Sequence, residues 1–238
     1  MTGRSGDVFI VCSASPRAGV STTARLLTDY RLFSGAPVTG FDTDPRDPHY
    51  GALFPDLVRT VDIGDIKGQI ALFDRLLAVD SDTKIVDVWH RERQRFFQTV
   101  RDIGFIEEAR RKGIVPVLLF HADGTDAALA SALSLNAAWP QLPMIVVHND
   151  GARPLDAEAR EGLRRYPARS KFVVTALPGP VANILEDPSL SLSRFLLAPP
   201  TGMSIVVRAA LKSWIAPIFT QLRSFDLRRE LEASAYLR

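Results

Sequence analysis

Short blocks of consecutive apolar residues alternate along the chain with segments in which apolar residues recur every three or four positions. Near-continuous apolar blocks are typical of strands that are covered on both faces. The predicted strands are Val8–Cys12, Pro37–Phe41, Lys84–Val88, Ile114–Phe120, Pro143–His148 and Lys171–Val174. The predicted helices are Ser21–Phe33, Gln69–Val79, Arg91–Lys112, Thr125–Trp139 and Asp156–Tyr166. This alternation predicts an α/β fold, with a doubly wound, mostly parallel sheet flanked by helices.

The C-terminal part of the chain has a different pattern. The stretch Leu177–Pro200 is rich in Pro and Ser and predicts a loop with a short helix inside it. A helical pattern resumes over Thr201–Phe225, with a kink expected at Pro217, and a short charged helix is expected over Asp226–Arg238. We therefore expect one α/β domain over residues 1–200 and a C-terminal helical appendage over 201–238 that packs on it. Gly35 and Gly113 follow predicted helices and are expected to end them.

Composition narrows the class of protein. The 238 residues are 46% hydrophobic and 24% charged, which excludes a mainly disordered chain and a collagen-like repeat. The single Cys12 permits no intramolecular disulfide and no cysteine-based zinc cluster. A net charge of +2 is smaller than a duplex-wrapping protein needs. The apolar run Val8–Cys12 is too short for a signal peptide, and charged residues interrupt the stretch 203–222, so we expect a cytoplasmic protein without a membrane span.

The loop after the first strand carries the main candidate chemistry. Small residues follow Cys12 in the order Ser-Ala-Ser-Pro-Arg-Ala-Gly-Val-Ser-Thr, and a helix then begins. Backbone N–H groups at a helix N-terminus attract anions, and small residues let a phosphate approach the main chain. Against G-x-x-x-x-G-K-[ST], Gly19 and Ser21 match, whereas Ala14 replaces the first glycine and Val20 replaces the lysine. The loop predicts phosphate binding with weak or absent hydrolysis, because the lysine would contact the β and γ phosphates.

Polar residues follow the later strands in an order that strengthens this interpretation. Asp42-Thr-Asp44-Pro follows the second strand, Asp87 ends the third, and Asn149 follows the fifth. Together with the loop, this order resembles the ParA/MinD family of P-loop ATPases with a deviant Walker A motif, over roughly residues 8–200. The resemblance implies a P-loop NTPase-like fold that binds ATP or ADP with Mg²⁺ where the site is functional.

The resemblance also implies a role for each matching residue. Ser15 stands where the family has its signature lysine, and Arg17 and Ala18 stand where it has two glycines. The implied nucleotide-binding set is Ser15, Arg17, Ala18, Gly19, Val20, Ser21, Thr22 and Asn149, with Asn149 at the base. Ser21, Asp42 and Asp87 are the implied metal-facing residues, and Asp44 is the residue implied to orient the attacking water. Both family lysines are missing, and Arg17 is the only cation of the loop.

Simpler structural roles stay open for several of these residues. Asp42 and Asp44 can cap a turn before Pro45, and Asn149-Asp-Gly is a good turn sequence by itself. Three histidines lie at the ends of predicted strands, where ligands of parallel sheets bind, which makes a histidine-based site a minor alternative. They are His90, His121 and His148.

The leading functional hypothesis is a ParA/MinD-like protein with a degenerate nucleotide site, either a pseudo-ATPase or a weak ATPase. It would serve as a regulatory or scaffolding component in positioning, partitioning or envelope assembly. The alternatives are an active ATPase of the same fold, with Arg17 in place of the lysines, and a doubly wound enzyme acting on a small phosphorylated substrate. The resemblance further implies a homodimer and a protein partner. Membrane contact through the C-terminal helix and binding of nucleic acid through surface arginines are further expectations.

Overall fold

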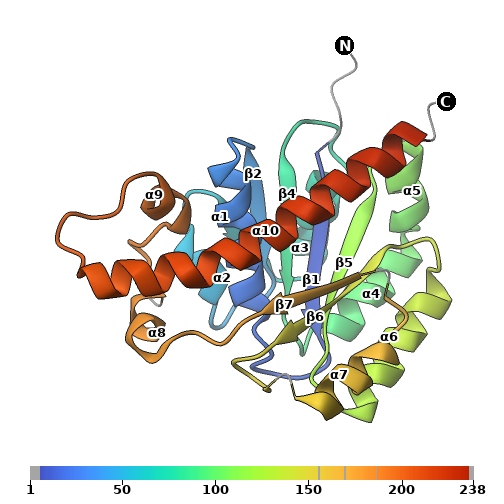
Figure 1. Cartoon of the computed structure of the whole chain (residues 1–238). Coiled ribbons are helices and arrows are strands. Elements are labelled where there is room, and N and C mark those ends of the chain that lie inside the picture. The colour runs from blue at the N-terminus through green and yellow to red at the C-terminus, as the bar shows by residue number, and fades with distance from the viewer. Residues whose placement is uncertain (1–5, 155, 169, 186, 236–238) are drawn as a thin grey trace.

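The computed structural model describes residues 6–154, 156–168, 170–185 and 187–235. Within these residues the chain forms a seven-stranded sheet in the order β3-β2-β4-β1-β5-β6-β7 (Figure 1). Every neighbouring pair of strands is parallel. The strands are β1 (Val8–Ser13), β2 (Val38–Asp42), β3 (Val58–Thr60), β4 (Thr83–Val88), β5 (Pro116–His121), β6 (Met144–Asn149) and β7 (Ser170–Val174). The predicted doubly wound, parallel α/β fold is confirmed.

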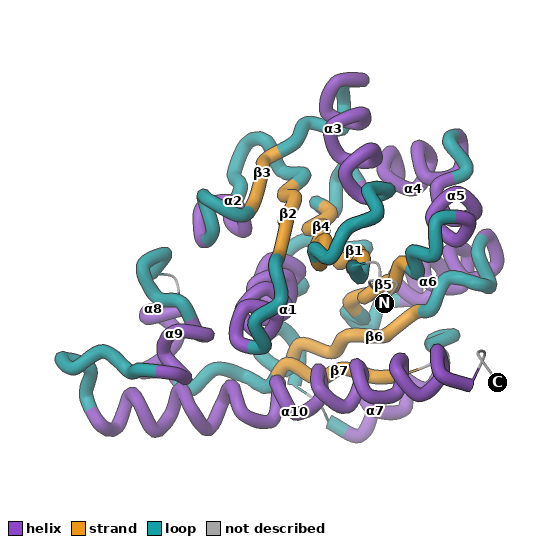
Figure 2. Tube along the Cα trace, turned by 90° about the horizontal axis from the view of Figure 1, so that it is seen from above, coloured by secondary structure: helices purple, strands orange, loops and turns teal. Residues whose placement is uncertain are grey.

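Helices cover both faces of this sheet. They are α1 (Val20–Phe33), α2 (His49–Leu53), α3 (Ile66–Leu76), α4 (Arg93–Asp102), α5 (Phe105–Arg111), α6 (Asp126–Ala138), α7 (Ala157–Arg164), α8 (Gly179–Leu185), α9 (Leu192–Leu197) and α10 (Ile205–Ala235). One core lies between the sheet and α3 to α7. The other lies between the sheet and α1, α2, α8, α9 and α10. Figure 2 shows α1 and α10 beneath the sheet and α3 and α4 above it.

Three local predictions need correction. The helix predicted over Arg91–Lys112 is two helices, because Gly104 has a φ of +61° and separates α4 from α5. The edge strand β3 and the five-residue α2 were not predicted, because both are too short to show a strand or helix pattern in the sequence. Two short helices, α8 and α9, occupy the stretch that was expected to hold one.

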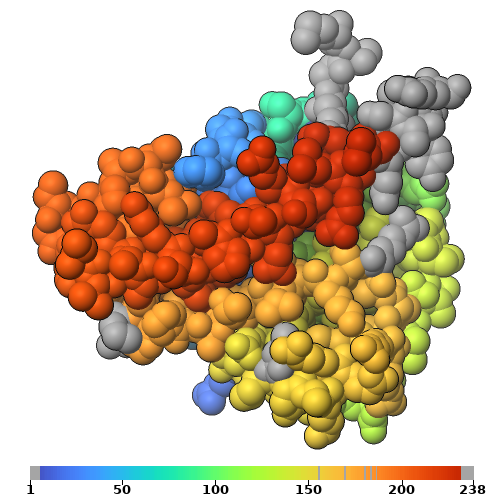
Figure 3. Space-filling model, viewed as in Figure 1, coloured from blue at the N-terminus to red at the C-terminus, as the bar shows by residue number. Residues whose placement is uncertain are grey.

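The C-terminal helix is longer than the sequence pattern predicts. It runs without interruption from Ile205 to Ala235, with Pro217 inside it, so the separate helix expected from Asp226 does not exist. By length and composition it is apolar enough over Ile205–Leu231 to cross a membrane, which differs from the expectation of no span, and 33% of that window is buried. Leu211, Trp214, Ile215, Ile218 and Leu222 are buried in the core against the sheet and α1. Figure 3 shows α10 lying along the surface of the domain over most of its length.

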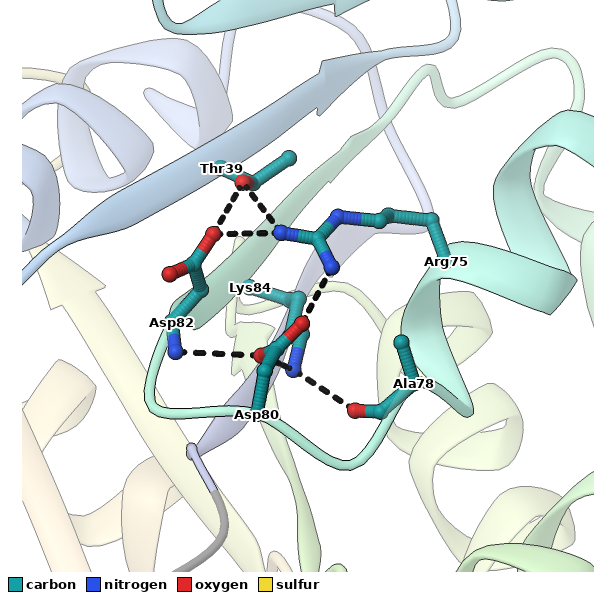
Figure 4. Close-up of polar contacts among 6 residues, drawn as sticks. All are labelled: Thr39, Arg75, Ala78, Asp80, Asp82 and Lys84. Carbon is teal, nitrogen blue, oxygen red and sulfur yellow. Dashed lines mark hydrogen bonds and ion pairs between the residues drawn. The ribbon is translucent and has the colours of Figure 1, made fainter.

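A network of charges holds the amino end of β4. Lys84 is fully buried, and its ammonium group donates to the Ala78 carbonyl at 2.9 Å and to the Asp80 carboxylate (Figure 4). Arg75 forms ion pairs with Asp80 and Asp82. Burial acts to raise the pKa of Asp80, but the bonds from Lys84 and Arg75 outweigh it and hold this pKa below its ordinary value. Lys84, the buried charge of this network, therefore has an opposite charge beside it.

Candidate functional site

The turn between β1 and α1 leaves the N-terminus of α1 open. Gly19 precedes the helix with a φ of +92°, and no side chain caps the first turn. By contrast, α3, α6 and α7 are each capped by a side chain, from Asp65, Thr125 and Asp156. The first N–H groups of a helix have no partner within the helix, and here no acidic side chain in the first turn compensates them. The turn is thus electrostatically suited to an anion.

Asn149 braces this turn from the end of β6. Its amide donates to the Ala18 carbonyl at 3.1 Å, and its side-chain oxygen accepts from the Gly151 N–H at 3.1 Å. A Cβ on Gly19 would lie 2.1 Å from the Asn149 Nδ2 atom, so only glycine fits at that position. Both polar atoms of the Asn149 side chain are engaged within the chain. A second N–H and a second lone pair of this side chain stay available, so the contact of Asn149 with a nucleotide base stays a prediction.

Ser15 and Arg17 differ sharply in their surroundings. The Ser15 hydroxyl donates to the carboxylate of Asp123, which lies just beyond β5, and its N–H donates to the Ser13 hydroxyl at 3.1 Å. Arg17 is exposed, has a positive φ of 56°, and forms no ion pair with the described residues. A non-glycine residue in the left-handed region is strained. The loop therefore presents one free cation and has one side chain, Ser15, tied to the neighbouring loop.

Ser21 and Asp87 meet at the carboxyl ends of neighbouring strands. Asp87 lies near the end of β4, where it pairs in register with Val11 of β1, and it is 4% exposed. The Ser21 hydroxyl, in the first turn of α1, lies near enough to this carboxyl group to affect its pKa. Burial, followed by the nearby charge of Asp42, raises the pKa of Asp87 to about 8, although the neighbouring Ser21 hydroxyl opposes the shift. Because Asp87 has no ion pair among the described residues, a cation here would favour its ionised form.

The two aspartates after β2 build the local turn. One Asp42 oxygen accepts from the N–H groups of Tyr50 and Gly51, each at 3.0 Å, and the other accepts from the Asp44 N–H. Asp44 accepts in turn from the N–H groups of Arg46 and Asp47. Burial raises the pKa of Asp42 despite these bonds. Asp42 lies close enough to Asp87 to shift its pKa, but its own lone pairs mainly hold α2 and the loop.

The three histidines lie at the carboxyl edge of the sheet, as predicted. His121 and His148 are buried at the ends of β5 and β6, and His90 follows β4. The His121 ring lies beside the Ala18 backbone, and burial lowers its pKa to about 4. Among the described residues, no three His, Cys, Asp or Glu side chains converge as a metal-ligating group. A metal at this edge would therefore need ligands from a bound molecule or from water.

Two features of the site were missed by the sequence analysis. Asp123, the partner of Ser15, follows β5 at the same edge as the other candidates, and that position alone could have identified it. Trp89, directly after β4, has the guanidinium groups of Arg46 and Arg91 over its ring, at 6.0 and 5.5 Å from the centroid. Nothing in the order of residues indicates this stacking, which forms when the loops after β2 and β4 fold together.

The fold and the site define a doubly wound α/β protein with an open, phosphate-loop-like turn after its first strand. Solved structures with a similar arrangement are nucleotide-binding proteins and ParA/MinD-family ATPases. A nucleotide-binding protein from Archaeoglobus fulgidus in complex with ADP is 14% identical, with 78% of this chain and 90% of that chain covered and a TM-score of 0.49. A ParA family ATPase from Chlorobium tepidum TLS is 12% identical, with 90% and 99% covered and a TM-score of 0.47.

A third similar structure is a chain of the MinC:MinD cell division protein complex from Aquifex aeolicus. It is 9% identical, with 84% of this chain and 99% of that chain covered and a TM-score of 0.44. No protein-family model matches the chain, and no curated protein matches it either. At these identities and scores the residue assignments rest on the geometry of this chain alone.

Proposed function

We propose that the chain binds a nucleotide with Mg²⁺ at the carboxyl edge of its sheet, around the turn between β1 and α1. The observation that carries this proposal is the proximity of the Ser21 hydroxyl to the buried Asp87 carboxyl, directly beside the uncapped N-terminus of α1. A buried acid without a cation and a helix terminus without an anion are each unfavourable alone. A magnesium–phosphate group would compensate both.

The residues present fit such a ligand. The open N–H groups of the first turn of α1, together with Gly19, Ser21 and Thr22, would hold phosphate oxygens. Ser21 and Asp87 would face Mg²⁺, with Asp42 as a neighbouring negative charge. This ion usually needs only one or two protein ligands when it also binds phosphate. Bound there, Mg²⁺ would neutralise phosphate charge, and Asp87 would release its proton as its carboxylate became paired.

Weak or absent hydrolysis is part of the proposal. Val20 and Ser15 supply no charge where the deviant P-loop family has lysines, and Asp44 is engaged in its own turn. Electrostatic stabilisation of the transferred phosphoryl group is the main catalytic requirement, and Arg17 is the loop's only cation. We therefore propose a regulatory or scaffolding role in the cytoplasm, in which bound nucleotide favours a homodimer or a protein partner.

Two further contacts belong to this proposal with less support. Membrane contact is supported by the exposed Ile205 and Val206 at the start of α10. The arginines of α4 and α5 supply positive charge that nucleic acid would require, such as Arg95, Arg110 and Arg111. Neither contact is needed for nucleotide binding, and each can fail without affecting it.

Titration calorimetry with ATP and with ADP, each with Mg²⁺, tests the proposal. We expect micromolar binding that Asp87→Ala weakens by at least about tenfold, since a charge-assisted contact is lost. Asp47→Asn, which changes an exposed acid at the same edge, is the matched control and should bind as the unchanged protein does. Absence of heat and of thermal stabilisation at millimolar nucleotide would refute nucleotide binding and favour the alternative of another phosphorylated ligand.

The variant Val20→Lys separates a degenerate site from an active one. It places a cation where the P-loop motif requires it, on a half-buried residue at the start of α1. If the site is degenerate, this variant should bind ATP more tightly than the unchanged protein. Steady phosphate release by the unchanged protein, equal to that of the variant, would contradict the hypothesis that the nucleotide site is degenerate.

The proposed homodimer is tested separately. Light scattering with and without nucleotide measures the mass of the protein in solution, which should double when nucleotide favours the dimer.

A further inference from the structure

A small cleft lies under the second half of α10, on the face of the sheet away from α4. Its volume is about 140 Å³. Its inner wall is apolar and comes from β1, β5, β6, β7 and α10, namely Phe9, Leu119, Ile145, Phe172, Leu222 and Phe225. Polar residues of β7 and α10 line the remainder. A dry apolar cavity of about this volume, in another protein, accepts benzene. The cleft is therefore large enough for a short apolar group, with polar side chains beside it.

Two cations at this cleft have no acidic partner among the side chains that the structure describes. Lys171, the second residue of the edge strand β7, and Arg228, in α10, are both exposed residues that line the cleft. Neither forms an ion pair with the described side chains; Arg228 donates only to the Ser224 carbonyl, at 3.2 Å. Two other arginines of this face, Arg31 and Arg229, are paired with Asp226 and Asp7. Unpaired positive charge beside an apolar cleft favours an anion that carries an apolar tail.

The backbone of β7 adds a donor on the same side. Gln221 of α10 bonds the outer edge of β7 at Val173, where it accepts from the N–H at 2.9 Å and donates to the carbonyl at 3.0 Å. In a parallel strand, residues two apart direct their N–H and C=O groups to the same side. The Lys171 N–H therefore points to the side that α10 covers, beside the cleft.

We propose that this cleft binds a small amphiphilic anion, a carboxylate with a short alkyl or aromatic tail. The tail would lie against Phe9, Ile145 and Leu222, and the carboxylate would contact Lys171 and Arg228. Such a ligand would join α10 to the edge of the sheet and stabilise the docking of this helix. The site lies on a different part of the sheet from Ser21 and Asp87, so the proposal is independent of nucleotide binding.

Hexanoate is the probe that tests the proposal, with hexanol and acetate as matched ligands that lack the charge or the tail. We expect hexanoate to shift the methyl NMR signals of Ile145, Leu119 and Leu222, while those of Val86 and Val88, on the other face, stay in place. Each methylene removed from the tail should weaken binding about fourfold. Shifts confined to the other face, or no response at millimolar hexanoate, would overturn the proposal.

Charge variants test the polar half of the site. Lys171→Gln and Arg228→Gln change exposed side chains, so folding should persist, and each should weaken hexanoate binding about two- to fivefold without affecting hexanol. Arg223→Gln alters an exposed arginine of the same helix that does not line the cleft, and it should have no effect. Equal affinity for hexanol and hexanoate would overturn the anion assignment. So would binding to anionic lipid vesicles with no binding of monomeric hexanoate.

Discussion

The two ends of strand β4 differ in whether a buried charged side chain has an oppositely charged partner. At its amino end, the buried Lys84 is bonded to a carboxylate and a carbonyl, and Arg75 adds a second cation to the same network. Three residues later, Asp87 is almost as deeply buried, yet the groups that shift its pKa are the neutral Ser21 hydroxyl and the acidic Asp42 and Asp44. At the amino end the charges are paired within the chain. At the carboxyl end the Asp87 carboxyl group has no charged partner among the described residues and would be paired by a bound cation.

This difference separates a structural region from a candidate site. A buried charge is costly unless it is paired, so the network around Lys84 contributes to stability only while all its members are present. The uncompensated Asp87 lowers the stability of the chain by itself, which is typical of positions that serve binding. The comparison therefore predicts that substitutions at the two ends will change stability in opposite directions.

Removal of the buried cation should have the largest effect. Lys84→Ala leaves Asp80 without its main partner and opens space in the core, so we expect a loss of about 3–5 kcal/mol in the free energy of unfolding. Urea denaturation measures this loss. Lys112→Ala, which removes an exposed lysine at the end of α5, should change it by less than about 0.5 kcal/mol. A similar small change for Lys84→Ala would show that the network contributes nothing.

Substitution of the uncompensated acid should stabilise the chain. The pKa of Asp87 is about 8 in the folded chain, far above the ordinary value of an aspartate, so its protonated form favours the folded state. That stability is complete below about pH 4 and is lost as pH rises through about 8. Asp87→Asn should remove this loss and raise the free energy of unfolding by up to about 4 kcal/mol at pH 7.

Asp80→Asn gives the opposite pH dependence and is the control. Because the pKa of Asp80 is lowered in the folded chain, its contribution is present above the ordinary pKa and is lost as pH falls through the lowered value. Thermal unfolding between about pH 2 and pH 8 distinguishes the two variants. If Asp87→Asn were less stable than the unchanged chain across this range, the Asp87 carboxylate would have a stabilising partner within the chain. The proposed difference between the two ends of β4 would then be wrong.

The smallest effect is expected at Ser21. Ser21→Ala removes the hydroxyl beside Asp87, so the pKa of Asp87 should rise further, at a cost in stability of no more than about 1 kcal/mol. Carbon NMR of the aspartate carboxyl groups follows that pKa directly. Thr22→Ala, at the adjacent half-buried position, should leave the pKa of Asp87 unchanged. An unchanged pKa in Ser21→Ala would remove Ser21 from the proposed metal site.

Much of the fold was predictable because its strands are buried on both faces. Six strands appear where apolar blocks were found, and Gly35 and Gly113 follow helices with φ values of +75° and +73°. The break at Gly104 was missed, since the apolar stripe continues through it from Val100 to Ile106. The uninterrupted α10 was also missed, because packing of Trp214, Ile218 and Leu222 on the core holds the helix together around Pro217.

The candidate site was predictable in position but only partly in contacts. Residues after parallel strands share one edge, which places the loop 13–22, Asp42, Asp87 and Asn149 together. Which of them face a ligand depends on their hydrogen bonds. Asn149 donates to the Ala18 carbonyl, and Asp42 accepts from the N–H groups of Tyr50 and Gly51. The Ser21 hydroxyl, by contrast, lies near the Asp87 carboxyl group.

The sequence alone determined the order and type of most elements and the edge on which polar residues gather, because apolar periodicity is a local property. Only the tertiary structure decided which charges are compensated. Lys84 and Asp80 are close in sequence, but Ser15 and Asp123 are 108 positions apart. The cleft under α10 likewise forms between Phe9 at one end of the chain and Leu222 near the other. The energy of a buried charge or cavity depends on everything that packs around it, and packing joins residues that no sequence pattern brings together.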